Sequence, residues 1–108
     1  MNEYENADVA MSLIAYSGEA RTYAFEALKC ARGNDFVQAK ALMECAEVSS
    51  TKAHQAQTTL LVSEANGNAI TINVLLVHAQ DHLMTSMLAL ELIQELIVLH
   101  ESKEDKKG

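Results

Sequence analysis

The fold is decided by residues 73–99, which read NVLLVHAQDHLMTSMLALELIQELIVL. Leucine and isoleucine recur here at three- and four-residue spacing, which is the period of an amphipathic helix. Two apolar stripes run along this helix, offset around its axis: Leu76, Leu83, Leu90, Ile93 and Ile97 form one, and Leu88, Leu92, Leu96 and Leu99 form the other. Because a single neighbouring hairpin cannot bury both stripes, we expect further copies of the chain to cover the second.

Glycines divide the rest of the chain. Gly33, followed by Asn34 and Asp35, predicts a helix end and then a helix N-cap, and Gly67 predicts a second helix end. The predicted helices cover residues 6–32, 35–66 and 73–101. Since helices this long leave a thin core, they predict an elongated three-helix bundle that runs up, down and up.

The first two predicted helices have inner faces rich in small residues. The first face comprises Val9, Leu13, Tyr16, Ala20, Ala24, Ala27 and Ala31, widened by Phe25 and Leu28. The second comprises Ala39, Leu42, Ala46, Ser49, Ala53, Ala56 and Leu60. Such residues permit close helix approach. The third helix is expected to begin with Asn73 as its N-cap, and the mixed-charge tail 102–108 is expected to fray.

Composition supports one all-α domain over residues 1–108. The chain has no proline, four glycines and 5% aromatic residues, a balance that long helices tolerate and β-sandwiches do not. Eight basic against fifteen acidic residues give a net charge of −7, which opposes binding to nucleic acid and to anionic membranes. The N-terminal residues have no signal-peptide pattern, so we expect a cytoplasmic protein without membrane insertion. Cys30 and Cys45 are expected to be free thiols, since antiparallel helices would offset them by about 10 Å.

The residues with the most reactive side chains cluster in His78-Ala79-Gln80-Asp81-His82, where two imidazoles, an amide and a carboxylate interrupt an apolar helix. His78, Asp81, His82 and Thr85 share one helix face. Three interpretations fit this patch. The groups can hydrogen-bond one another across the bundle, they can hold a metal, or a histidine can act as a nucleophile, because neutral imidazole is nucleophilic at pH 7. The zincin pattern is absent, which makes hydrolytic metal chemistry improbable.

Four segments carry a resemblance to one family. The segment 77–85, VHAQDHLMT, closely resembles the active-site segment of the lactose/cellobiose-type IIA components of the bacterial sugar phosphotransferase system. AYSGEAR (15–21), GNDF (33–36) and AHQAQT (53–58) resemble that family's first-helix signature, first turn and second-helix signature. Thr22 and Asn73 depart from it slightly, since serine is more usual there.

The resemblance implies a phosphocarrier that assembles as a homotrimer with nine helices. A histidine at the position of His78 would accept phosphate from the carrier protein HPr and pass it to a cysteine of the IIB component. IIB in turn would phosphorylate a β-linked disaccharide (cellobiose, lactose or diacetylchitobiose) as the membrane component IIC admits it. The chain itself would bind no sugar.

The same resemblance implies a shared metal and suggests supporting residues. Asp81 would meet its two symmetry mates around a divalent cation on the three-fold axis, and oxygen ligation favours Mg²⁺ over Zn²⁺. His82 and Gln80 are candidates for supporting the phosphoryl group, with Gln80 alternatively an exposed docking residue, and His54 and Gln57 are candidate neighbours of the site. Gly18 suggests a close backbone approach near it.

A rival function is a non-catalytic helical module that oligomerises and binds a partner through its acidic surface. It predicts that His78 is dispensable. The two functions therefore make opposite predictions about His78, so a substitution at this residue separates them.

Overall fold

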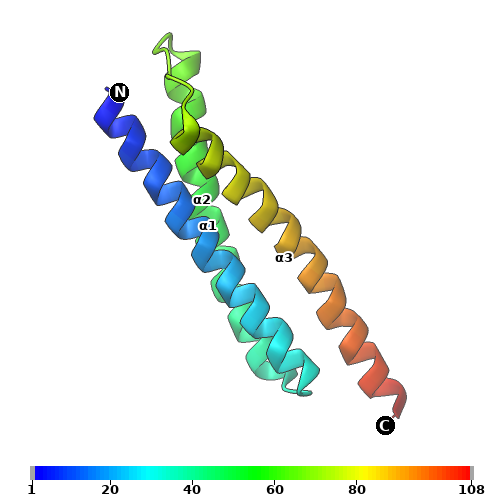
Figure 1. The fold of residues 1–108 in the computed structure, drawn as a ribbon. Helices are drawn as coiled ribbons and strands as arrows, with labels where there is room; N and C mark the ends of the chain where they lie inside the picture. Colours follow the sequence, from blue (N-terminus) through cyan, green and yellow to red (C-terminus); the bar gives the residue numbers. More distant parts are fainter. Residues whose placement is uncertain (1, 108) are drawn as a thin grey trace.

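Three helices run up, down and up along one long axis in the computed structural model, which describes residues 2–107 (Figure 1). They are α1 (Glu3–Arg32), α2 (Phe36–Ala65) and α3 (Val74–Lys107). The molecule measures 59 × 20 × 18 Å, and the two chain ends lie at opposite ends of its long axis. The predicted all-α class and helix order are confirmed.

The caps at the two connections follow the sequence closely. The side chain of Asp35 accepts the backbone N–H of Gln38 at 3.1 Å, and that of Asn73 accepts the N–H of Leu76 at 2.9 Å. Gly67, which marks the predicted end of the second helix, is left-handed, with φ of 90°. In the first turn, however, Asn34 and not Gly33 is left-handed, with φ of 65°. After glycine, asparagine is the residue that best tolerates this conformation, so the left-handed residue that ends α1 is found one position later than Gly33.

Two helices extend beyond their predicted bounds. α1 begins at Glu3 because the side chain of Asn2 accepts the N–H of Glu5 at 2.9 Å, which caps the helix earlier than residue 6. α3 continues to Lys107, so the prediction that the tail frays is wrong for residues 102–107. Lys106, in the last turn, interacts favourably with the helix dipole. Gly108 lies outside the described residues.

The core is thin and divides into two clusters along the axis. The upper cluster, at the N-terminal end of Figure 1, contains Ala10, Leu13, Ala53, Leu60, Ala79 and Leu83. The lower cluster contains Ala20, Ala24, Ala27, Ala31, Ala39, Met43, Ala46, Leu90, Ile93 and Ile97. α1 and α2 therefore meet through alanine, whereas α3 supplies most of the large aliphatic side chains. Phe25, expected in the core, is 53% exposed, whereas Met43, expected in core or interface packing, is buried.

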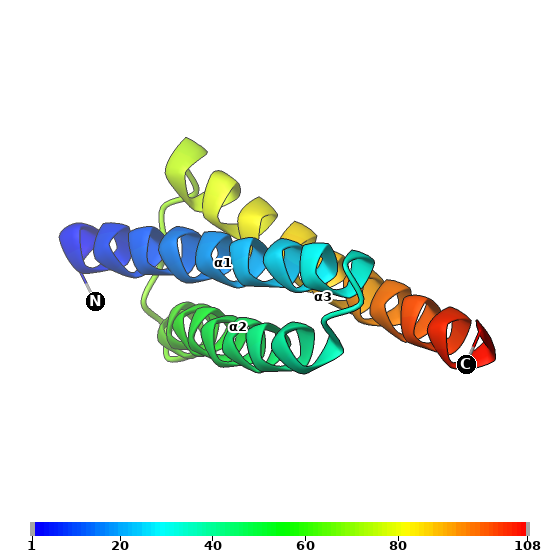
Figure 2. The same cartoon turned by 90° about the horizontal axis from the view of Figure 1, so that it is seen from below.

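α3 packs mainly on α1 and makes the fewest contacts with α2. Figure 2 shows it crossing behind α1 at an angle. The predicted second stripe of α3 lies on its outer side: Leu88, Leu92, Leu96 and Leu99 are 42–56% exposed. By length and composition, α3 is also the one helix within residues 2–107 that could cross a membrane, although the core helix of a soluble protein passes the same test. Only 28% of its most apolar window is buried in the single chain.

Candidate functional site

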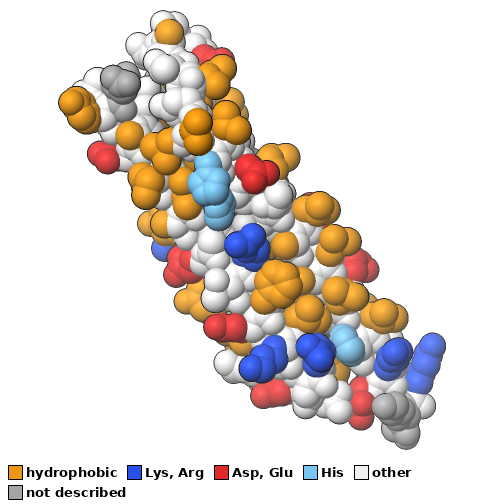
Figure 3. Space-filling view, viewed as in Figure 1, with side chains coloured by type: hydrophobic (Ala, Val, Ile, Leu, Met, Phe, Trp, Pro, Cys, Tyr) orange, Lys and Arg blue, Asp and Glu red, His pale blue; other side chains and the backbone are white. Residues whose placement is uncertain are grey.

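The start of α3 positions the two central histidines. Asn73 caps the helix, so His78 lies in its second turn, on the upper half of the molecule. Figure 3 shows histidine side chains at the surface there, bordered by hydrophobic side chains, an acidic group and a basic group. Within the described residues, none of the main surface hollows contains either histidine. The site is therefore a shallow surface, which suits contact with another macromolecule better than capture of a small one.

His78 and His82 form a close pair. Their Nε2 atoms lie 3.1 Å apart, and the rings meet edge to face with centroids 4.5 Å apart. His78 is exposed and His82 is half-buried. The predicted sharing of one face is confirmed for these two residues, and their contact is a hydrogen bond between ring nitrogens.

The surroundings of His82 indicate which nitrogen carries the proton in the neutral pair. Nδ1 of His82 is buried and has no hydrogen-bond partner. Because a buried N–H without an acceptor is rare in native proteins, we assign the proton of His82 to Nε2. Nε2–H of His82 then donates to His78, which leaves the lone pair of His78 on Nε2. The exposed imidazole thus presents an unprotonated nitrogen, as a nucleophile requires.

Asp81 and Thr85 lie on the same exposed side of α3. The Thr85 hydroxyl donates to the backbone carbonyl of Asp81 at 2.8 Å, so it is engaged with its own helix. Asp81 is exposed, and no hydrogen bond to its carboxylate is found among residues 2–107. The same residues contain no cluster of three or more side chains that could hold a metal. A single chain therefore offers one carboxylate and no complete metal site.

Gln80 points away from the histidine pair and toward α2. Its Oε1 accepts a hydrogen bond from Nε2 of Gln57 at 2.7 Å, and both amides are half-buried. The expectation that Gln80 is an exposed docking residue is wrong, because a residue two positions after His78 lies on nearly the opposite side of the helix. The expected approach of Gln57 to α3 is confirmed.

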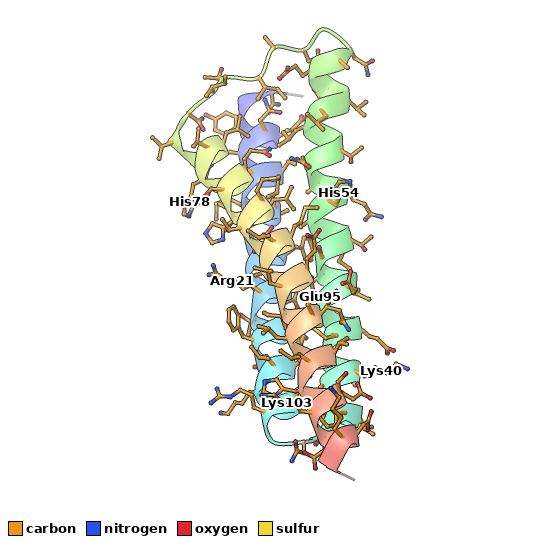
Figure 4. The ribbon with its side chains drawn as sticks, turned by 90° about the vertical axis from the view of Figure 1, so that its right-hand side faces the viewer. Arg21, Lys40, His54, His78, Glu95 and Lys103 are labelled. Atoms are coloured by element: carbon orange, nitrogen blue, oxygen red, sulfur yellow. The ribbon has the colours of Figure 1, made fainter. Side chains whose placement is uncertain are left out.

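His54 lies apart from the other histidines. It is exposed on α2, and Figure 4 shows it on the opposite side of the bundle from His78. Within one chain the structure thus brings His78 and His82 together, pairs Gln80 with Gln57, and leaves His54 and Asp81 outside both pairs.

Gly18 and Arg21 both belong to the AYSGEAR segment of α1 (15–21). A Cβ built on Gly18 meets nothing within 4 Å, so the expected close backbone approach is absent from the single chain. Arg21, one turn later, extends to the same side of the molecule as His78 (Figure 4). Arg21 is not a candidate on the sequence alone, because nothing local connects it to α3. The signal that could have found it is its place, with Gly18, on one edge of α1.

Comparisons with known proteins agree on one family. Residues 8–101 match the family described as "PTS system, Lactose/Cellobiose specific IIA subunit". The chain is 50% identical over 97 residues to the N,N'-diacetylchitobiose-specific EIIA component of Escherichia coli K12, covering 90% of this chain and 84% of that one.

Solved structures agree with that match. The cellobiose-specific enzyme IIA of Bacillus anthracis superposes with a TM-score of 0.91 at 40% identity, covering 98% and 95% of the two chains. IIA(Chitobiose), solved in complex with HPr, superposes with a TM-score of 0.80 at 46% identity, covering 96% and 99%.

Proposed function

The chain belongs to the lactose/cellobiose-specific IIA family and is a component of a sugar phosphotransferase system, and we propose that His78 is the residue that carries the phosphoryl group. In this proposal Nε2 of His78 accepts the group from phosphorylated HPr and passes it to a cysteine of a IIB component. The single observation that carries the proposal is the exposed imidazole of His78, whose Nε2 lies 3.1 Å from Nε2 of His82.

The reaction needs little from the protein beyond position and charge. Nε2 of His78 attacks phosphorus in line with the bond to the donor imidazole, so one P–N bond forms as the other breaks. In the second step a cysteine thiolate of IIB attacks the same phosphorus, and the electron pair of the P–N bond returns to Nε2. A shallow, exposed site supports this exchange because the partner protein must bring its own reacting atom to within bonding distance.

His82 has a defined task in this scheme. Before transfer, its Nε2–H occupies the lone pair of His78 at 3.1 Å. After transfer, the same N–H can turn to an oxygen of the phosphoryl group without breaking any other hydrogen bond. Gln80 takes no direct part within one chain, since its amide pairs with Gln57 on the far side of α3.

HPr is the proposed donor, and its binding to a similar protein supports this choice. IIB and the membrane component IIC are the proposed acceptor and transporter, which places the chain in the cytoplasm and leaves sugar binding to other subunits. The sugar is a β-linked disaccharide. Relatives named for cellobiose and for N,N'-diacetylchitobiose are both 40–50% identical to this chain, so the fold itself does not select the sugar.

A homotrimer is the proposed assembly. The outer stripe of α3 (Leu88, Leu92, Leu96 and Leu99) leaves a continuous apolar strip in water, which single soluble chains seldom expose. Three copies packed through this stripe would bury it around a common axis and form a bundle of nine helices. The same strip accounts for the membrane-like hydropathy of α3 without a membrane.

A divalent cation on that axis is proposed together with the trimer. Asp81 precedes the outer stripe by seven residues, or two turns, and so continues it toward the N-terminal end of α3. Three such carboxylates would converge and repel one another, and Mg²⁺ suits ligands made only of oxygen. The fit depends on three copies, because one chain supplies a single exposed carboxylate.

Transfer of labelled phosphate tests the proposal. The wild-type chain is incubated with phosphoenolpyruvate, enzyme I and HPr, and phosphorus and nitrogen NMR locate the label. We expect acid-labile, base-stable phosphate on Nε2 of His78 and none on His78→Ala. His54→Ala, which changes an exposed histidine on the other side of the bundle, is the control and should accept phosphate normally. A wild type that acquires no label, or a label that persists in His78→Ala, would overturn the proposal.

A further inference from the structure

The phosphoryl group on His78 would enter a strongly acidic setting. Phosphorylation adds about −1.5 to −2 charges at neutral pH. The chain already carries −7, and Asp81 lies one turn after His78 on the same exposed side. His82 supplies a neutral N–H, and the helix dipole contributes only a fraction of a charge. A nearby cation is therefore the missing part of the site.

Arg21 is placed to be that cation. α1 and α3 run in the same direction, and their packing gives the register: Leu13 lies in one core cluster with Leu83, and Ala20 lies in the next with Leu90. Arg21 therefore leaves α1 at the upper edge of the lower cluster, about two turns below His82. Side chains in a helix tilt toward its N-terminus, so the guanidinium extends back toward the level of the histidines.

The figures agree with this register. Figure 4 shows the Arg21 side chain on the side of the bundle where His78 lies, at a lower level than His78 in this view. From a perpendicular direction, Figure 3 shows a Lys or Arg side chain immediately beside the histidine patch. Figure 4 thus places Arg21 on the side of the histidines, and Figure 3 shows a basic group next to them at the surface.

The guanidinium is available and has room to move. Arg21 is exposed, and no hydrogen bond or ion pair of its side chain is found among the described residues. Its side chain lies over the preceding turn, which begins at Gly18. A Cβ on Gly18 would meet nothing within 4 Å, so the space beside the turn that Arg21 lies over is open. A larger side chain at position 18 would occupy part of that space.

We propose that Arg21 binds the phosphoryl group carried by His78, donating from its planar guanidinium to two phosphoryl oxygens. Arginine suits this role because its fork of N–H groups matches phosphate geometry and its charge is permanent. The inference rests on the proposed function, since it concerns the phosphorylated state of His78. It makes α1 part of the active site, although the nucleophile and its partner histidine both lie on α3.

Three variants test the inference. Arg21→Gln removes the charge, Arg21→Lys keeps it without the fork, and Arg32→Gln removes an exposed arginine from the last turn of the same helix as a matched control. Circular dichroism establishes that all three remain helical. Transfer from phosphorylated HPr is then measured over a range of HPr concentrations, together with the lifetime of the phosphohistidine and its phosphorus chemical shift.

We expect Arg21→Gln to lower kcat for phosphoryl transfer about tenfold or more, to shorten the lifetime of the phosphohistidine and to move the phosphorus resonance. Arg21→Lys should recover part of kcat, and Arg32→Gln should match wild type. A change in KM alone would assign Arg21 to docking and overturn the inference, as would an Arg21→Gln variant that behaves like Arg32→Gln. If the wild type takes no phosphate on His78, it is the proposed function that fails.

Discussion

The two sides of α3 are built from the same residue types and lie in opposite environments. On the inner side, Leu83, Leu90 and Ile93 are 1–4% exposed. On the outer side, Leu88, Leu92 and Leu99 are 55–56% exposed. The inner side stabilises one chain and the outer side has no cover within it. An apolar stripe can therefore be recognised in the sequence, whereas the surface that covers it depends on how many helices one chain provides.

The largest effect expected from this comparison is loss of assembly in Leu92→Asp. Burying an unpaired carboxylate in an apolar interface would cost about 4 kcal/mol per subunit, and a trimer would incur it three times. The mass measured by sedimentation should therefore fall from about three times 11.8 kDa to 11.8 kDa. Val48→Asp on α2 is the matched control, because Val48 is 57% exposed and Leu92 is 56% exposed. A trimer that survives Leu92→Asp would show that this side is not the interface.

A smaller effect is expected for Leu83→Ala on the inner side. Leu83 is 1% exposed in the upper core cluster, and truncating a buried leucine lowers the free energy of unfolding by about 3 kcal/mol. Urea denaturation should detect this loss even in the Leu92→Asp background, where the chain is expected to be a monomer. In the same background, Leu88→Ala on the outer side should lower the free energy of unfolding by under about 1 kcal/mol, because the Leu88 side chain already faces water. Equal losses at Leu83 and Leu88 would contradict the division into two sides.

The predictable part of the fold is the part set by local chemistry. Glycine, asparagine and aspartate positions located both connections, and the caps at Asp35 and Asn73 formed as predicted. The left-handed residue of the first turn was misplaced by one, since Gly33 and Asn34 compete for the same role and only the final hydrogen bonds decide. The helical structure of residues 102–107 was not predicted because this segment has few apolar residues. Most of its residues are nevertheless good helix formers.

The candidate site divides in the same way. The contact between His78 and His82 follows from their spacing on one helix, which the sequence contains in full. The pairing of Gln80 with Gln57 and the position of Arg21 on the same side as His78 both depend on how α3 crosses its neighbours, and no local pattern encodes that crossing. Residues that act across two helices are therefore the ones that sequence analysis misses or misassigns.

An intermediate effect is expected for Asp81→Leu, which extends the outer side of α3 by one apolar residue. If three carboxylates meet around a cation, this change removes both their repulsion and the need for metal, so the trimer should gain about 1–2 kcal/mol. A chelator should lower the melting temperature of wild type and leave that of Asp81→Leu unchanged. Identical responses of the two proteins to chelator, with no metal in the purified wild type, would contradict the shared site.

The smallest effect is expected for Gly18→Ala. This substitution tests whether the space beside Gly18, which is empty in the single chain, stays empty in the assembled protein. Glycine inside a helix is about 0.5–1 kcal/mol less stable than alanine, and the added Cβ at this position meets nothing within 4 Å. The melting temperature should therefore rise by roughly 2–6 °C. Ala15→Gly, at an exposed position one turn earlier on α1, is the reverse control and should lower it by a similar amount. A Gly18→Ala variant that melts at or below the wild-type temperature would mean that another copy of the chain approaches α1 here, because the single chain contains nothing for that methyl group to strike.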